Sequence, residues 1–151
     1  MGIRSRVRLC AGWIALGAVA GCGVTAVSPP DITTSGDAIP QALAAGPADP
    51  ARGLKIMAGR DANCLLCHAV PESGQRFMGD LAPSLSGIGS RMTAAQLRLR
   101  VVDMSRLNPG TIMPPYYRTT GLYNVAGDYR GRPVLSATEI EDVVAYLQTL
   151  K

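Results

Sequence analysis

The five residues Cys64-Leu65-Leu66-Cys67-His68 constrain this 151-residue chain more than any other feature. They read C-x-x-C-H, the spacing at which two thiols at a helix start can bond one porphyrin while the histidine lies beneath its iron. His68 is the single histidine of the chain. The motif predicts one covalently bound haem c, attached through Cys64 and Cys67, with His68 as the proximal iron ligand.

Other roles for this motif lack the residues that they need. A structural zinc site takes four ligands, mostly Cys and His, and outside the motif the chain offers only Cys10 and Cys22. A thioredoxin-like redox pair needs a βαβ setting, which no part of the sequence indicates. A chance occurrence of C-x-x-C-H remains the plain alternative.

Residues 1–21 have the pattern of an export signal. A basic start precedes an apolar run at residues 9–20. This run is shorter than the stretch of about 20 apolar residues that a bilayer-spanning helix needs. Val19-Ala20-Gly21-Cys22 resembles a bacterial lipobox, so we expect a lipidated Cys22, with an ordinary cleavage and an unmodified thiol as the alternative. These features predict a periplasmic protein tethered to a membrane as a lipoprotein.

Residues 22–48 are rich in Pro, Gly, Ala, Ser and Thr and show no sustained period. Such a segment buries too little apolar surface to offset the entropy of ordering it. We therefore expect a flexible tether between the anchor and a folded domain at residues 49–151.

The mature chain is nearly neutral. Without Arg4, Arg6 and Arg8, the 15 basic residues fall to 12, against 11 acidic ones. No basic stripe with interleaved aromatic residues is visible, so binding of nucleic acid is not expected. With Cys22, Cys64 and Cys67 assigned and Cys10 lost with the signal, no pair remains for a disulfide.

The pattern of residues 49–151 predicts a single all-α domain of about four helices around one haem. Helices are expected at about 50–58 with Asp49 as N-cap, at the haem motif, from Thr93 through Met104, and from Ser136 through Leu150. Thr93 with Gln96, and Ser136 with Glu139, have capping-box spacing. An apolar stripe of helical period on the last helix indicates a packing face.

The second axial iron ligand cannot be histidine, because no other is present. Methionine is the usual partner in electron-transfer cytochromes c, and Met78, Met92, Met104 and Met113 follow the motif. Met113 is favoured because flanking prolines indicate a stiff, extended loop. Met104 is the next candidate, and Lys55 or Lys151 are remoter alternatives.

Ala82-Pro83-Ser84-Leu85-Ser86-Gly87 resembles the G-P-x-L-x-G loop of class I cytochromes c. In that class the proline carbonyl accepts a hydrogen bond from the histidine ring and so orients it. The resemblance implies a class I cytochrome c fold, with Pro83 in this supporting role. Ala82 stands where the class has glycine.

Three further stretches narrow the resemblance. Residues 100–103, the loop Asn108-Pro109-Gly110-Thr111-Ile112-Met113-Pro114 and residues 131–147 resemble the SoxX family. SoxX proteins are the monohaem subunits of the SoxAX complex of bacterial thiosulfate oxidation. The resemblance covers most of residues 51–151, whereas the lipobox and long tether depart from the typical member.

The resemblance implies a function within a complex. This chain and a SoxA-like cytochrome partner would together form an L-cysteine S-thiosulfotransferase. The partner would join thiosulfate to a cysteine of a SoxYZ-type carrier protein. This chain would accept the released electrons and pass them to a soluble cytochrome c, with no catalytic residue of its own. The alternatives are a general lipid-anchored electron shuttle unrelated to sulfur, and a haem enzyme or gas sensor with an open iron position.

A cluster of tyrosines and arginines follows Met113. Its members are Tyr116, Tyr117, Arg118, Tyr123, Tyr129, Arg130 and Arg132. Tyr and Arg are favoured at protein interfaces, so the cluster indicates either a partner surface or a cover for the haem edge.

Overall fold

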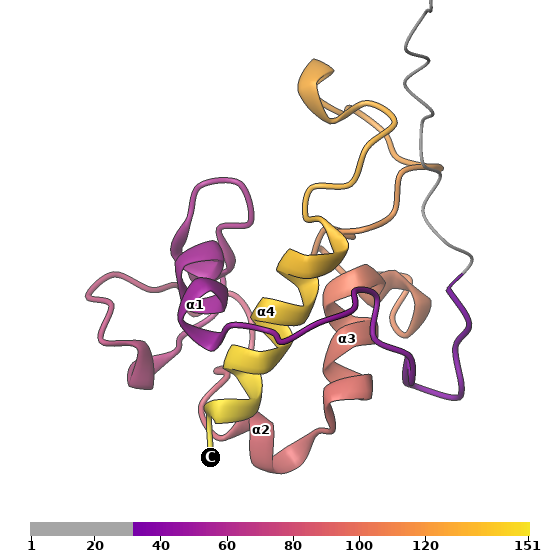
Figure 1. The fold of residues 1–151 in the computed structure, drawn as a ribbon. Coiled ribbons are helices and arrows are strands. Elements are labelled where there is room, and N and C mark those ends of the chain that lie inside the picture. The colour runs from indigo at the N-terminus through magenta and orange to yellow at the C-terminus, as the bar shows by residue number, and fades with distance from the viewer. Residues whose placement is uncertain (1–31) are drawn as a thin grey trace, which may run out of the picture.

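Four α-helices and four short 3₁₀ turns make up the regular structure of residues 32–151, the part that this computed structural model describes (Figure 1). The helices are α1 (Pro50–Ala58), α2 (Ile88–Arg91), α3 (Ala94–Asp103) and α4 (Ala137–Thr149); the 3₁₀ turns are η1 (Cys64–Leu66), η2 (Pro71–Ser73), η3 (Met104–Arg106) and η4 (Gly127–Tyr129). The predicted export signal and Cys22 lie outside the described residues. The predicted all-α fold is confirmed, and within residues 32–151 no helix is both long and apolar enough to cross a bilayer.

The predicted helix starts are present with their caps. The Asp49 side chain accepts hydrogen bonds from the amides of Ala51 and Arg52, at 2.9 and 3.2 Å. Thr93 and Ser136 each form a complete capping box, which satisfies amides that a helix start otherwise leaves unpaired. Two details differ: the haem motif forms a 3₁₀ turn, and the single-turn α2 has no periodic signal in the sequence.

The first and last long helices cross at Gly53. A Cβ added to Gly53 would lie 2.1 Å from the Asp142 carbonyl oxygen and 3.0 Å from Cβ of Tyr146. Only glycine lets the two helix backbones approach this closely. Because the haem motif follows α1 after a short turn, this crossing also sets where the motif lies.

A buried carboxylate reinforces the same crossing. Asp142 of α4 accepts a hydrogen bond from the Asp49 amide at 2.7 Å and is paired with the Arg52 guanidinium. Burial alone would raise the pKa of Asp142, but the bonds from Arg52 and the Asp49 amide outweigh it and hold that pKa below its ordinary value. The stabilisation from this pair is therefore present above the ordinary pKa and is lost as the pH falls through the lowered one.

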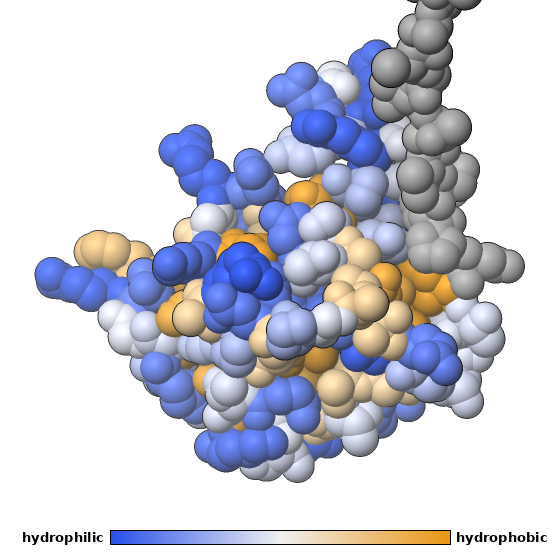
Figure 2. All heavy atoms as spheres, in the orientation of Figure 1, coloured by the Kyte–Doolittle hydropathy of each residue, from blue (hydrophilic) through white to orange (hydrophobic). Residues whose placement is uncertain are grey.

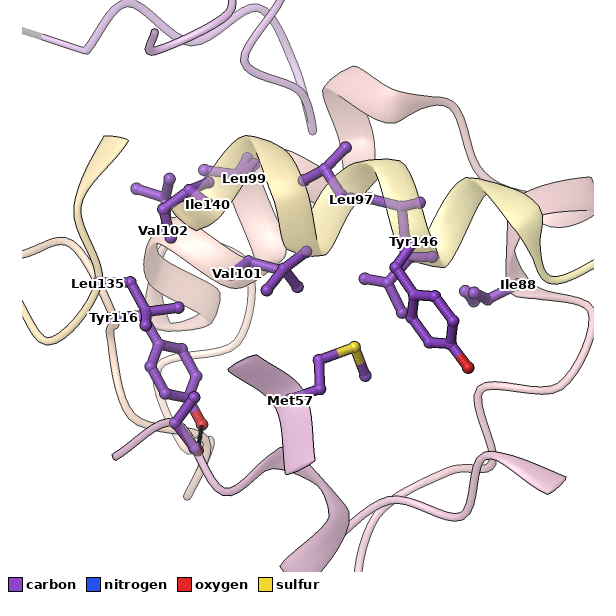
Figure 3. Packing of buried hydrophobic residues seen from close by; sticks show 14 of the residues in the cluster. Met57, Ile88, Leu97, Leu99, Val101, Val102, Tyr116, Leu135, Ile140 and Tyr146 are labelled. Atoms are coloured by element: carbon purple, nitrogen blue, oxygen red, sulfur yellow. Dashed lines mark hydrogen bonds between the residues drawn. The ribbon is translucent and has the colours of Figure 1, made fainter. Parts of the chain in front are cut away.

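The core is built from one face of each long helix. Met57 of α1, Val101 of α3 and Tyr146 of α4 face the same interior in Figure 3. The stripe predicted on the last helix is buried throughout: Ile140, Val143, Val144, Leu147 and Leu150. It is a packing face, as the helical period indicated.

Residues 37–43 differ from the flexible tether that composition predicted. They cross α3 and α4 (Figure 1) with Ile39 fully buried. The Ile39 amide donates to the Ala95 carbonyl oxygen at 2.9 Å, and its own carbonyl oxygen accepts from Arg98 at 2.6 Å. Glu141 pairs with Arg98 at 2.7 Å and accepts from the Leu43 amide at 2.8 Å. Partners more than 50 residues away hold this segment, and composition cannot reveal them.

Replacing Gly53 by alanine tests the helix crossing. The added methyl group has no room, and overpacking of this kind costs about 1–3 kcal/mol or more. We expect Gly53→Ala to lower the free energy of unfolding by that amount, measured by urea denaturation of the haem-loaded protein. Gly127→Ala is the control, since nothing lies within 4 Å of its added Cβ; equal effects of the two changes would refute the close approach.

Candidate haem site

The three motif side chains project from one tight turn. Asn63, in the left-handed conformation at φ 45°, leads into η1. The amides of Cys67 and His68 both donate to the Cys64 carbonyl oxygen, at 3.2 and 3.0 Å. Leu65 is buried and anchors the turn to the core. Two thiols and one imidazole are thereby held within five residues of a single loop.

The His68 ring is oriented by the proline loop. Its Nδ1 lies 2.7 Å from the Pro83 carbonyl oxygen, the contact that the class I resemblance implied. A carbonyl can only accept, so Nδ1 carries the proton and Nε2 is left with its lone pair for a metal. A hydrogen bond of this kind fixes the ring plane and makes the metal-binding nitrogen more basic.

Backbone hydrogen bonds clamp the proline loop onto the motif. The Gly79 amide donates to the Leu65 carbonyl oxygen at 2.8 Å, and the Ala82 amide donates to the Cys67 carbonyl oxygen at 2.9 Å. An added Cβ at Gly79 would lie 1.9 Å from the Leu66 carbonyl oxygen. Gly79 is thus required for close approach, a role that no motif in the sequence reveals.

Alanine is accommodated where class I cytochromes have glycine in this loop. Among the described residues other than glycine, only Asn63 and Asn124 have a positive φ. Ala82 therefore has a backbone conformation open to any L residue, and the departure from the class pattern leaves the His68–Pro83 contact intact.

Tyr116 supports the entrance to the motif. Its hydroxyl donates to the Ala62 carbonyl oxygen at 2.7 Å (Figure 3). Burial is the main cause that raises the pKa of Tyr116 and also raises that of the neighbouring Cys64 thiol to about 11. The tyrosine therefore stays a neutral hydrogen-bond donor, and Cys64 lies in an apolar setting.

The candidate second ligands are in different situations. The Met78 sulfur accepts a hydrogen bond from the Val70 amide at 3.1 Å, which holds it to the loop after the motif. Lys151 donates to the Gly89 carbonyl oxygen at 2.8 Å, so its amine is already engaged. Met92 ends α2, and Met104 begins η3.

Met113 lies in a loop fixed at both ends. Its amide donates to the Thr111 hydroxyl at 3.1 Å, and its side chain is partly buried against the core. Beyond the two prolines, the Tyr117 amide donates to the Val102 carbonyl oxygen at 3.2 Å. This arrangement holds the Met113 thioether in a defined place on the core surface.

The tyrosine and arginine cluster divides into two groups. Tyr116 and Tyr117 are core residues, and Arg118 binds the buried Asp103 at 3.2 Å. The remaining members lie in the 119–132 loop, where the Arg132 guanidinium lies 5.5 Å from the centre of the Tyr129 ring. An open hollow of about 460 Å³ within that loop includes none of the motif residues.

The residues present fit a covalently bound haem c. The turn supplies two thiols for thioether bonds, an imidazole with its Nε2 free, and a carbonyl that fixes the ring. Among residues 32–151, no group of three or more His, Cys, Asp and Glu side chains could hold a bare metal ion.

Comparison with known proteins agrees with this site. The family model for cytochrome c matches residues 50–151. A chain in the crystal structure of SoxXA from P. pantotrophus superposes with a TM-score of 0.74 at 34% sequence identity, covering 82% of this chain and 97% of that one. Residues 50–151 make up about two thirds of the chain, whereas this match covers 82% of it. The match therefore also includes residues ahead of α1. A search of curated proteins finds no match.

Three features together define a class I c-type cytochrome: crossed terminal helices, a C-x-x-C-H turn, and a hydrogen bond from the motif histidine to a proline carbonyl oxygen. Such a cytochrome is an electron-transfer protein with covalently bound haem c. The chain belongs to the cytochrome c family and, within it, is a SoxX-type cytochrome.

Replacing Gly79 by alanine tests how the site is built. The added methyl group would push the proline loop away from the motif, and the His68–Pro83 bond would lengthen. We expect Gly79→Ala to be isolated with less haem per chain and a lower unfolding midpoint than the unaltered protein, measured by haem absorbance against protein mass. Gly127→Ala should retain its haem; equal, full haem content in both variants would contradict the clamp.

Proposed function

We propose that this chain is the electron-transfer subunit of a SoxAX-type complex that acts in thiosulfate oxidation. The observation that carries the proposal is the likeness to the SoxXA structure, at 34% identity over 82% of this chain. The name SoxXA denotes two components, so we infer a SoxA-like cytochrome as the partner of this chain. A haem motif alone, shared by many unrelated cytochromes, would not carry this inference.

The proposed reaction takes place on the partner. A carrier cysteine thiol and thiosulfate become joined by one sulfur–sulfur bond, and the thiol proton and two electrons are released. The partner, of L-cysteine S-thiosulfotransferase type, would hold the reacting groups, and a SoxYZ-type protein would supply the cysteine. This chain, with one haem, would accept one electron at a time. Two successive electron transfers would therefore follow each sulfur–sulfur bond that is formed.

The residues of this chain hold a redox group and close it to substrate. Bound haem supplies reversible one-electron exchange. Cys64 and Cys67 would anchor it, and His68 would bind the iron through Nε2 while Pro83 keeps the ring in place. We assign Met113 as the second residue that would bind the haem iron. With His68 and Met113 both bound to the iron, thiosulfate would be kept from it, and this chain would only relay electrons.

The cellular setting forms part of the proposal. Export would place the domain in the periplasm. A lipid on Cys22 would anchor it beside a membrane, with the residues after Cys22 as a tether. A small soluble cytochrome c would then collect the electrons from the complex. Export and the lipid anchor rest on the sequence pattern of residues 1–31, outside the described structure, and the soluble acceptor rests on the family resemblance.

Met113→Ala tests the ligand assignment. Losing the thioether opens one iron position, so we expect the reduced variant to bind carbon monoxide with a clear spectral change, whereas the unaltered protein resists it. Met104→Ala is the matched control and should also resist carbon monoxide. Carbon monoxide binding by the Met104 variant and not the Met113 variant would transfer the ligand role to Met104.

The function itself is tested with the mature haem protein from its native cells. We expect it to co-purify with a second cytochrome and its haem to be reduced when thiosulfate and a SoxYZ-type carrier are both added. Omitting either one should abolish the reduction. A lone monomer that small reductants reduce but thiosulfate with carrier does not would leave a general electron shuttle instead.

A further inference from the structure

A buried tyrosine links the loop of the assigned second ligand to the haem motif. The Tyr116 hydroxyl donates to the Ala62 carbonyl oxygen at 2.7 Å (Figure 3) and is in hydrogen-bond contact with the Cys64 thiol. Within the part of the chain that the structure describes, the hydrogen bonds of this hydroxyl are the only ones that join residues 108–118, here named the Met113 loop, to residues 59–68. Tyr116 is therefore the polar link between this loop and the motif.

Two prolines make the stretch between Met113 and Tyr116 stiff. The rings of Pro114 and Pro115 fix φ at about −65°, and a residue that precedes proline is confined to extended backbone. Met113 itself precedes a proline, so three successive residues have little freedom to rotate. A shift of Tyr116 is therefore passed on to the Met113 backbone, because the residues between them cannot absorb it.

The backbone around Tyr116 is bound to the helices, and the hydroxyl alone reaches the motif. The Tyr116 carbonyl oxygen accepts a hydrogen bond from the Leu135 amide at 3.0 Å, and the Tyr117 amide donates to the Val102 carbonyl oxygen at 3.2 Å. Removing the hydroxyl would leave both of these bonds in place. Its loss would therefore release the loop from the motif and not from the helices.

The chain beyond the Met113 loop does not brace it. Residues 119–132 leave the body as a projecting loop in Figure 1, and none of them is buried. Figure 2 shows mainly hydrophilic atoms on this projection. A segment with few buried apolar contacts is held only weakly in one place, so the position of the Met113 loop depends on contacts at Tyr116 and before it.

Both ends of the bond from Tyr116 to Ala62 lie in the interior. Tyr116 is 5% exposed and Ala62 is 6% exposed. A buried carbonyl oxygen that loses its donor costs more than one that water can reach. Any movement of the Met113 loop that breaks this bond would leave the Ala62 carbonyl oxygen without a donor, so the bond opposes the movement.

We propose that Tyr116 is a positioning residue for electron transfer: its hydroxyl keeps the Met113 loop at the haem motif and so stabilises the bond that the Met113 sulfur would make to the iron. This inference rests on the ligand assignment within the proposed function and on none of its statements about thiosulfate or partners. An iron that keeps the same two protein ligands in both oxidation states exchanges electrons without first breaking a bond.

The test measures carbon monoxide binding by the reduced, haem-loaded full chain. Tyr116→Phe keeps the buried ring and removes one oxygen atom. Carbon monoxide binds only iron that Met113 has left, so its apparent dissociation constant varies inversely with that fraction. We expect Tyr116→Phe to lower this constant about tenfold, the factor that corresponds to one buried hydrogen bond.

Two control variants separate this effect from a general loosening of the fold. Tyr117 is also buried in the Met113 loop, and its hydroxyl forms no hydrogen bond within residues 32–151, so Tyr117→Phe is the matched control. Ile39→Ala removes a fully buried side chain from a distant segment and lowers stability. Both should leave the constant within about twofold of that of the unaltered chain; an equal fall in Ile39→Ala would overturn the inference.

A double variant shows whether Tyr116 acts through Met113. Met113→Ala already opens the iron, so adding Tyr116→Phe should change the constant by less than about twofold. A further fall of about tenfold in this background, or no fall from Tyr116→Phe alone, would refute the positioning role. If Met113→Ala does not tighten carbon monoxide binding, the ligand assignment and the inference both fail, while thiosulfate-dependent reduction still decides the electron-relay function.

A measurement on the unaltered chain covers the case in which Tyr116→Phe is isolated without haem. Coupling between two sites is reciprocal, so displacing Met113 from oxidised iron with excess imidazole should also loosen Tyr116. We expect the Leu135 amide, which donates to the Tyr116 carbonyl oxygen, to exchange with deuterium about tenfold faster in the imidazole complex. Unchanged exchange of this amide would show that the two positions are not coupled and would overturn the inference.

Discussion

The hydrogen bond from His68 to the Pro83 carbonyl oxygen is the constraint on which the site depends. It joins two loop segments that have no regular structure between them except η2, and it decides which ring nitrogen remains for iron. Without it the imidazole could turn about its own bonds, and Nε2 would not be held in one direction. The surrounding contacts explain how an irregular backbone can hold that bond.

Those contacts connect the site with the helices. Gly53 lets α1 press against α4, and Asp142 ties the same two helices at a buried carboxylate. The motif follows α1 after a short turn. At the entrance to the motif, the Tyr116 hydroxyl donates to the Ala62 carbonyl oxygen, and the Tyr116 carbonyl oxygen accepts a hydrogen bond from the Leu135 amide at 3.0 Å. A change at the helix crossing should therefore be felt at the haem turn as well as in overall stability.

The sequence predicted the features that short-range chemistry encodes. Capping boxes at Thr93 and Ser136 are signals within four residues, and the C-x-x-C-H spacing is a property of one turn. Pro83 was predictable only because a whole loop resembled that of class I cytochromes. What escaped prediction depends on distant partners. Ile39 is buried and held by Ala95 and Arg98 of α3, and the need for glycine at position 79 appears only when the proline loop meets Leu66. Tyr116 and Tyr117 were predicted to form a partner surface or to cover the haem edge, and the structure buries both in the core. Composition cannot tell an interface tyrosine from a core one.

The claim that unites site and function is that two protein ligands close the iron, so that this chain relays electrons and binds no substrate. X-ray absorption spectroscopy of the haem protein at the iron edge tests it most directly. The account predicts a six-coordinate iron with one sulfur neighbour, from Met113, and nitrogen at the remaining positions, unchanged when thiosulfate is added. An iron with five ligands, or one whose sulfur neighbour appears only with thiosulfate, would contradict it.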